Sequence, residues 1–384
     1  MRAAHEVPHH QALVREAGRV ALRSRYTPHP APGELLVATQ VAGVCGTDLQ
    51  MLRGLRDDPS PVIGHEGIAR VVAAGAGVPD ALRPGTPVVV NPTHRTDPSF
   101  LLGHNVEGLL QERTLIPATA VRDGLVLPLE QAPDPVLGTL VEPLAGVRYA
   151  LSLLATARPR TLVVYGDGTI GHLAVRAARR LLGADVRTVL VHHTREGRDW
   201  SARHPVAGTE PVLGGDRYEL PPLGEGPLAV LLATPRDATG RALESALRLD
   251  GGDTTIDMFG GLPPGAASAL LPGVDLTAVR AANCAGRPVP AAFTEAVTTD
   301  GRRVRLTGHR GVGNHHLAEA TAELHRHPAA YRDLVTHVVE PAEAARIMTA
   351  LAAGGSRTVA GERLIKLAVR FAPAPPSPKE TPCP

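Results

Sequence analysis

The chain of 384 residues has little cysteine, few aromatic residues, no excess charge of one sign and no long hydrophobic run. Its three cysteines, Cys45, Cys284 and Cys383, are too few for a disulfide framework and too far apart for a CxxC zinc knuckle, which suits a reducing compartment. Aromatic residues make up only 3% of the sequence, so platforms that stack nucleic-acid bases are not expected. The net charge of +2 argues against an electrostatic grip on nucleic acid or anionic lipid.

Membrane contact is not expected either. The longest apolar stretches, such as 149–157, are far shorter than the roughly 20 residues that a spanning helix needs. The first residues lack the apolar core of a signal peptide, so we expect a cytoplasmic protein. Apolar residues make up 43% of the chain, which is typical of globular proteins. The Pro-rich end, 372–384, is expected to be a disordered tail.

The sequence changes texture near residue 150. Up to about residue 140 it consists of short β-branched runs broken by Gly and Pro, which predicts an irregular β-rich domain. From about residue 160 it alternates strands and helices, and strands at 228–233, 254–259 and 304–308 predict a mostly parallel sheet. Leu173, Ala177 and Leu181 form one apolar helix face that Gly183 ends. The closing strands, near 334–340 and 362–369, are expected to join the β-rich domain.

A GxGxxG motif follows the first apolar strand of the second region and opens a helix. Gly166 permits a tight turn, Gly168 lets the backbone approach a pyrophosphate, and Gly171 lets helix and strand pack closely. The helix N-terminus then faces the negative charge, which predicts a dinucleotide site.

The next strand indicates which dinucleotide binds. It ends in His192, Thr194 and Arg195 without the carboxylate that usually accepts ribose hydroxyls, although Glu196 is available one step later. Arginine pairs well with a 2′-phosphate, so NADP(H) is preferred over NAD(H). The predicted cofactor-binding residues are Gly166, Gly168, Thr169, Ile170, Gly171, His192, Thr194, Arg195 and Thr234.

Three further motifs precede the glycine-rich turn: GVCGTD at 43–48, GHEG at 64–67 and VEP at 141–143. Together with GxGxxG, their order resembles that of the zinc-dependent medium-chain dehydrogenases/reductases, in the branch of polyol, sorbitol and threonine dehydrogenases. The resemblance covers nearly the whole chain. It implies an α/β fold in which a GroES-like β-rich catalytic domain (1–149 and 311–371) flanks a Rossmann domain with a doubly wound parallel sheet (150–310). It also implies a homodimer or homotetramer.

The resemblance further implies one catalytic zinc ion. The metal-binding residues of the family match Cys45 and His65, with either Glu66 or Glu142 as the carboxylate ligand. Such a set leaves one position open for water or an alcohol, which zinc acidifies as a Lewis acid. Thr47 matches the family hydroxyl that takes the alcohol proton, and Asp48 is expected to orient a histidine or to pair nearby. Glu66 is also a candidate catalytic residue.

The sequence departs from this family in three places. The segment 91–117 lacks the cysteines of a structural zinc lobe, and we interpret His94, Asp97 and His104 there as solvated loop residues. Gln50 stands where relatives often carry a titrating histidine. The long segment 260–303 carries Arg280, which we weigh equally as a substrate contact and as a solvent-exposed residue. Candidate substrate contacts are Gln50, Arg280, His309 and Arg310.

The function that follows is a zinc-dependent oxidoreductase. It transfers a hydride between a nicotinamide cofactor and a secondary alcohol or ketone of a small polar substrate, such as a polyol, a cyclitol or a sugar derivative, and a ketone reductase of a biosynthetic pathway is a variant of it. Three alternatives remain: a metal-free quinone or enone reductase, a non-redox zinc lyase, and a dinucleotide-binding protein without turnover.

Overall fold

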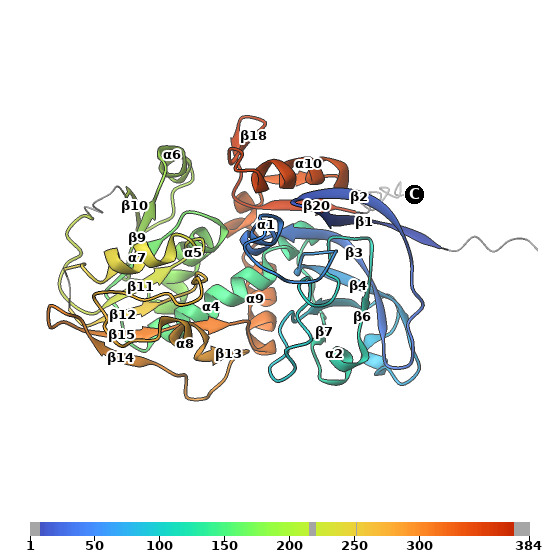
Figure 1. Ribbon diagram of the computed structural model, residues 1–384, viewed down its shortest axis with the longest axis horizontal. Helices are drawn as coiled ribbons and strands as arrows, with labels where there is room; N and C mark the ends of the chain where they lie inside the picture. The colour runs from blue at the N-terminus through green and yellow to red at the C-terminus, as the bar shows by residue number, and fades with distance from the viewer. Residues whose placement is uncertain (1–7, 215–219, 251, 372–384) are drawn as a thin grey trace, which may run out of the picture.

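The computed structural model describes residues 8–214, 220–250 and 252–371, so the expected Pro-rich tail lies outside the described residues. Two lobes stand side by side, each built around its own seven-stranded sheet (Figure 1). Among the described helices, none is long and apolar enough to cross a membrane.

The first sheet has the order β17-β20-β3-β4-β5-β7, with β6 paired to β3. The strands are β3 (Leu35–Val44), β4 (Glu66–Ala74), β5 (Pro87–Val90), β6 (Arg113–Ile116), β7 (Val126–Pro128), β17 (His337–Val339) and β20 (Leu367–Arg370). Around it lie the hairpin β1 (His9–Glu16) and β2 (Arg19–Tyr26), and the helices α1 (Gly46–Leu52), α2 (Ala118–Arg122) and α10 (Pro341–Ala352). As expected, the last strands of the chain join the β-rich lobe, where β20 pairs with β3.

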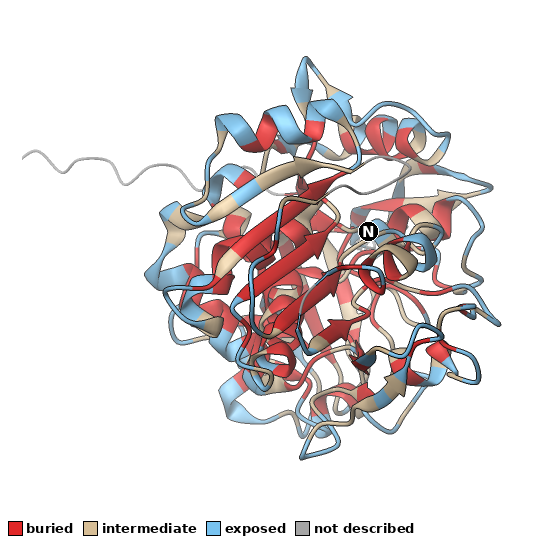
Figure 2. Ribbon diagram, turned by 90° about the vertical axis from the view of Figure 1, so that its left-hand side faces the viewer, coloured by how far each residue is buried: buried red, intermediate tan, exposed pale blue. Residues whose placement is uncertain are grey.

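The second sheet has the order β10-β9-β8-β11-β12-β15-β14, and every pairing except that of β14 is parallel. The strands are β8 (Thr161–Tyr165), β9 (Arg187–His192), β10 (Thr209–Leu213), β11 (Leu228–Leu232), β12 (Thr254–Asp257), β14 (Thr294–Val297) and β15 (Arg303–Thr307). Every residue of β8 and β11 is buried, as in sheets covered on both faces. Figure 2 shows these buried strands crossing the centre of the molecule.

The helices of this lobe are α5 (Thr169–Leu182), α6 (Arg195–Arg203), α7 (Thr239–Ala246) and α9 (Asn314–Arg326). The apolar face expected for α5 is present, because Leu173 and Ala177 are fully buried. The order of the strands reverses at β8 and β11, and open α/β sheets bind ligands at such a switch point. The sheet therefore presents its binding edge where the expected GxGxxG motif lies.

Shorter elements complete the chain: α3 (Pro135–Gly138), α8 (Leu276–Ala281), β13 (Asn283–Cys284), β16 (His309–Arg310), β18 (Thr358–Val359) and β19 (Glu362–Arg363). The helix α4 (Val141–Ala155) joins the lobes by packing against β4 of one and α5 of the other. One hydrophobic cluster follows it from Ile68 and Val89 through Leu144 to Leu231. This cluster crosses the boundary between the lobes, while the first lobe also has a separate apolar core of its own.

The segment 91–117 differs from the solvated loop that the sequence predicted. Phe100, Leu102, Leu109 and Leu110 are all buried in the core of the first lobe. Their burial carries His104 inward, to 5% exposure. The interpretation of His104 as a solvated residue was wrong, because the irregular loop is fastened by its own apolar side chains.

Candidate metal centre and dinucleotide site

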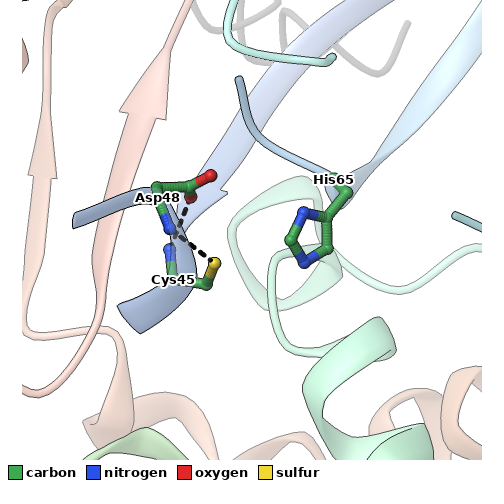
Figure 3. Close-up of side chains that lie close together, drawn as sticks. All are labelled: Cys45, Asp48 and His65. Carbon is green, nitrogen blue, oxygen red and sulfur yellow. Dashed lines mark hydrogen bonds between the residues drawn. The ribbon is translucent and has the colours of Figure 1, made fainter. Parts of the chain in front are cut away.

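Cys45 directly follows β3 and forms the N-cap of α1. Its Sγ accepts a hydrogen bond from the backbone N–H of Asp48 (3.3 Å), and its own N–H donates to Asp48 Oδ2 (2.8 Å). The other oxygen of Asp48 accepts from the N–H of Gly64 (3.2 Å), the residue before His65. Figure 3 shows the three side chains Cys45, Asp48 and His65. The carboxylate of Asp48 therefore fastens the loop of Cys45 to that of His65, and these hydrogen bonds come from backbone groups and not from an imidazole.

Two groups of potential metal ligands occur in the part of the chain that the structure describes, and His65 belongs to both. Cys45, Asp48 and His65 form one group, and His65, Glu66 and Glu142 form the other, with the ligand atoms of each group within 4.8 Å of one another. The Nδ1 atom of His65 is buried without a hydrogen-bond partner. The fold thus gathers a thiol, an imidazole and three carboxylates from the end of β3, the start of β4 and the first turns of α1 and α4.

The electrostatics of this cluster suit a bound cation. Burial raises the pKa of the Cys45 thiol well above its usual value, and the carboxylates of Asp48 and Glu66 raise it further. Burial also raises the pKa of Glu142. A divalent ion would stabilise the charged forms of both groups, so the donor set fits zinc.

Glu66 already has a cationic partner. The ammonium of Lys366 forms an ion pair with its carboxylate, and both side chains are almost completely buried. Lys366 also donates to the carbonyl of Val44 (3.3 Å). At Gly43 a Cβ would lie 2.7 Å from Lys366 Cε and 2.9 Å from Glu66 Oε2, so a larger residue there would have to displace this ion pair. The sequence analysis missed this residue, although a lone lysine inside an apolar closing strand was a usable signal.

His104 packs against the candidate metal ligand. The ring centroids of His104 and His65 are 5.3 Å apart, and His104 Nδ1 lies 3.3 Å from Asp58 Oδ2. Burial, followed by the charge of His65, lowers the pKa of His104 to about 4. The ring is therefore neutral at physiological pH. It lies beside the ring of His65, with its Nδ1 close to the carboxylate of Asp58. Thr47 and Gln50 lie nearby in α1, both half-buried.

The glycines of the GxGxxG motif have distinct roles in the turn after β8. Gly166 has φ +110°, and a Cβ there would lie 2.4 Å from the carbonyl of Ala233. At Gly171 a Cβ would lie 1.8 Å from the carbonyl of Gly166. Gly168 caps α5 without a side-chain hydrogen bond, and the space beside it is open for 4 Å. This geometry leaves a cradle at the N-terminus of α5 that fits a pyrophosphate.

The other predicted cofactor-binding residues near this turn have different surroundings. The hydroxyl of Thr169 donates to the carbonyl of Ile365 in the other lobe (2.7 Å). Ile170 packs against the shared hydrophobic cluster. Thr234 follows β11 at the binding edge, where its hydroxyl shares a hydrogen bond with Thr239 (3.0 Å).

The tip of β9 holds a carboxylate that the sequence analysis did not anticipate. Asp167, from the glycine-rich turn, lies 3.1 Å from the Nδ1 of fully buried His192 and 2.7 Å from a guanidinium nitrogen of Arg363. Burial opposes its charge, but the bonds from His192 and Arg363 hold the pKa of Asp167 down to about 2. Arg363 also donates to Thr194, whose hydroxyl caps α6. Arg195, the first residue of α6, is exposed.

The candidate substrate residues after β12 and β15 lie close to one another. His309 is buried, with its Nδ1 atom 3.8 Å from Asp257 Oδ2 and its ring 4.7 Å from that of Tyr149. Arg280 donates to the carbonyls of Phe259 (2.9 Å) and Gly260 (3.0 Å), so its guanidinium is not in solvent. Arg310 is exposed.

The profile of the alcohol dehydrogenase GroES-like domain matches residues 31–124. The glucose 1-dehydrogenase of Thermoproteus tenax is 30% identical over 44% of this chain and 53% of its own length. The sorbitol dehydrogenase of Gallus gallus is 30% identical over 45% of this chain and 53% of its own. The chain therefore spans about half the length of the curated relatives it matches. The crystal structure of galactitol-1-phosphate dehydrogenase from Escherichia coli covers 94% of this chain and 99% of its own, with a TM-score of 0.69 and 18% identity.

The fold is α/β, with a GroES-like lobe and a Rossmann-type parallel sheet. Residues 31–124 are similar to the alcohol dehydrogenase GroES-like domain, and the whole described chain shares its fold with the galactitol-1-phosphate dehydrogenase structure.

Proposed function

We propose that the protein is a zinc-dependent oxidoreductase that transfers a hydride between a nicotinamide dinucleotide and a secondary alcohol or ketone. The observation that carries this proposal is His65, which belongs to both groups of potential metal ligands and whose buried Nδ1 has no hydrogen-bond partner among the described residues. A buried ring nitrogen without a partner is costly, and a metal ion would satisfy it.

Cys45, His65 and Glu142 would hold the metal. Glu66 is less suited to permanent ligation because Lys366 already engages its carboxylate. When bound, zinc supplies Lewis-acid polarisation of a substrate oxygen.

The protein's own residues supply position and proton transfer. Asp48 keeps the two ligand loops in register through its backbone bonds. Thr47, half-buried in the first turn of α1, is the proposed acceptor of the substrate hydroxyl proton. Gln50 cannot titrate, so it can hydrogen-bond a substrate but cannot pass the proton onward.

For the cofactor we propose NADP(H) in preference to NAD(H). The carboxylate of Asp167 is held by His192 and Arg363 and is not free to accept ribose hydroxyls. Exposed Arg195 lies at the same tip, in the first turn of α6, where both its charge and the helix N-terminus favour a phosphate.

The proposed substrate is a small polar molecule with several hydroxyl groups, namely a polyol, a cyclitol or a sugar derivative. This choice draws on the names of the similar proteins, which act on glucose, sorbitol and galactitol 1-phosphate. Reduction of a ketone in a biosynthetic pathway uses the same site in reverse and remains part of the proposal. We also propose a homodimer or homotetramer, joined at the edge strand β14, whose Val297 is 59% exposed.

The first experiment measures the metal content of the purified protein and titrates it with NADPH and NADH by fluorescence. About one zinc ion per chain together with nucleotide binding is the expected result, and it justifies a screen of polyols, cyclitols and sugars for hydride transfer. Nucleotide binding without zinc would favour a metal-free quinone or enone reductase. Zinc without nucleotide binding would favour a non-redox lyase, and binding of both without turnover would favour a non-catalytic protein.

A further inference from the structure

Arginines follow the carboxyl ends of β11, β12 and β15, three adjacent strands of the parallel sheet. Arg236 follows β11, Arg310 follows β15 in β16, and the guanidinium of Arg280 binds the carbonyls of Phe259 and Gly260 just after β12. Open α/β sheets bind their ligands outside these strand ends. The group therefore lies on the binding edge of the sheet.

Two of these guanidinium groups have buried N–H donors without partners in the described part of the chain. They are Nη1 of Arg280 and Nε of Arg236. Burial lowers the pKa of Arg280 to about 10, and the charges of Arg310 and Arg236 act in the same direction. Unsatisfied buried donors beside like charges are unfavourable unless an acceptor of opposite charge joins them.

The other lobe contributes a fourth arginine. Arg56, in the loop after α1, binds Asp58 (2.6 Å), and its charge acts on both Arg236 and Arg280. Asp58 in turn lies 3.3 Å from His104, whose ring stands 5.3 Å from that of His65. Two side chains, Asp58 and His104, thus connect the arginine group to the candidate metal ligand.

The charge of the group matches a dianion. Asp58 forms an ion pair with Arg56 and also attracts Arg236, and buried Asp257 acts on Arg280 with the opposite sign. Two carboxylates therefore face four guanidinium groups, and within the described residues neither Arg236 nor Arg310 forms an ion pair of its own. A phosphate monoester carries about 1.5 to 2 negative charges at neutral pH. Its oxygens suit the forked donors of guanidinium groups.

We propose that Arg56, Arg236, Arg280 and Arg310 bind the phosphate of a phosphorylated polyol or sugar whose alcohol group reaches the metal centre. This inference rests on the proposed function, because it names the class of substrate for the same cleft.

The phosphates of the cofactor are a less suitable source. The cradle for its pyrophosphate is at Gly168, after β8, and the adenosine end belongs at the tip of β9. The strand order separates β9 from β12 by β8 and β11, which is roughly 14 Å at normal strand spacing. The arginine group lies on the opposite side of the switch point from the adenosine end.

The test is isothermal titration calorimetry of the full chain, loaded with zinc and saturated with nucleotide. The probes are inorganic phosphate, sorbitol and sorbitol 6-phosphate. We expect the phosphorylated polyol to bind more tightly than sorbitol, and Arg236→Gln and Arg310→Gln each to weaken it about tenfold. The matched control Arg303→Gln, at the opposite end of β15, should leave the affinity unchanged.

Two results would overturn the inference. Sorbitol and its phosphate could bind equally, or the Arg236 and Arg310 variants could weaken NADPH but not sorbitol 6-phosphate, which would assign the arginines to the cofactor. Zinc content and hydride transfer to unphosphorylated alcohols are measured on the same preparation. If these are normal while phosphate has no effect, this inference fails and the proposed function stands.

Discussion

The ammonium of Lys366 and the carboxylate of Glu66 form a buried ion pair beside the candidate metal centre, between residues 300 positions apart in the sequence. Lys366 is 1% exposed and lies on the closing segment of the chain, whereas Glu66 begins β4. The pair therefore links the closing segment of the described chain to the start of β4, directly after His65.

Removing one partner of this pair should destabilise the protein strongly. Lys366→Met leaves the Glu66 carboxylate buried without its cation, which typically costs about 3–5 kcal/mol. Urea unfolding at neutral pH, with zinc present, measures the change in the free energy of unfolding. The double variant Lys366→Met with Glu66→Gln should recover much of the loss, because it removes both charges. Equal stabilities of the single variant and the parent would contradict this account.

The thiol of Cys45 should be needed for the metal but not for the nucleotide. We expect Cys45→Ser to lose zinc and hydride transfer, because the hydroxyl is a much poorer zinc ligand than a thiolate. Binding of NADPH should stay nearly unchanged, since the cradle at Gly168 is built separately. Elemental analysis and fluorescence titration check both statements. Cys284→Ser, at the other free cysteine that the structure describes, is the matched control; activity in a metal-free Cys45 variant would disprove the zinc mechanism.

The choice of cofactor should depend on Arg195. Arg195→Glu places a negative charge at the N-terminal turn of α6 and should weaken NADPH about tenfold or more while changing NADH little. Arg203→Glu, at the other end of the same helix, is the control for a general charge effect. The dissociation constants of NADPH and NADH for each variant test this prediction. An unchanged ratio of the two constants in Arg195→Glu would show that Arg195 does not contact the 2′-phosphate.

Asp167 should make stability depend on pH in the acid range. Its pKa is lowered to about 2 in the folded protein, so its ion pair stabilises the fold above the unfolded pKa of about 4. That contribution, roughly 2 kcal/mol, is lost as the pH falls through the folded pKa. The difference in unfolding free energy between the parent and Asp167→Asn should therefore shrink between about pH 4 and pH 2. A difference that stays constant over this range would rule out the assigned ion pair.

Local patterns in the sequence predicted a large part of this molecule. The spacing of Leu173 and Ala177 predicted α5, and the three motifs around Cys45, His65 and Glu142 predicted side chains that the fold brings together. The helix was predicted correctly because periodicity is a property of neighbouring residues. Metal binding by the side chains that the fold gathers stays a prediction, which rests on the order of the motifs.

Such local patterns could not predict contacts between segments that lie far apart in the sequence. Nothing near Asp167 in the sequence indicates that Arg363 binds it, and nothing near Glu66 indicates Lys366. His104 was missed for a related reason, since it lies in an irregular segment without periodicity and is carried inward by Phe100 and Leu102. Partners of this kind follow from tertiary packing, which local propensity does not encode.

The apolar cluster that follows α4 through both lobes also bears on how the protein melts. Because Ile68 of one lobe and Leu231 of the other belong to the same cluster as Leu144, unfolding of either lobe would remove part of the apolar packing of the other. Loss of either half would expose a large apolar surface at once. The described chain should therefore melt as one cooperative unit, with a single calorimetric transition whose van't Hoff and calorimetric enthalpies agree.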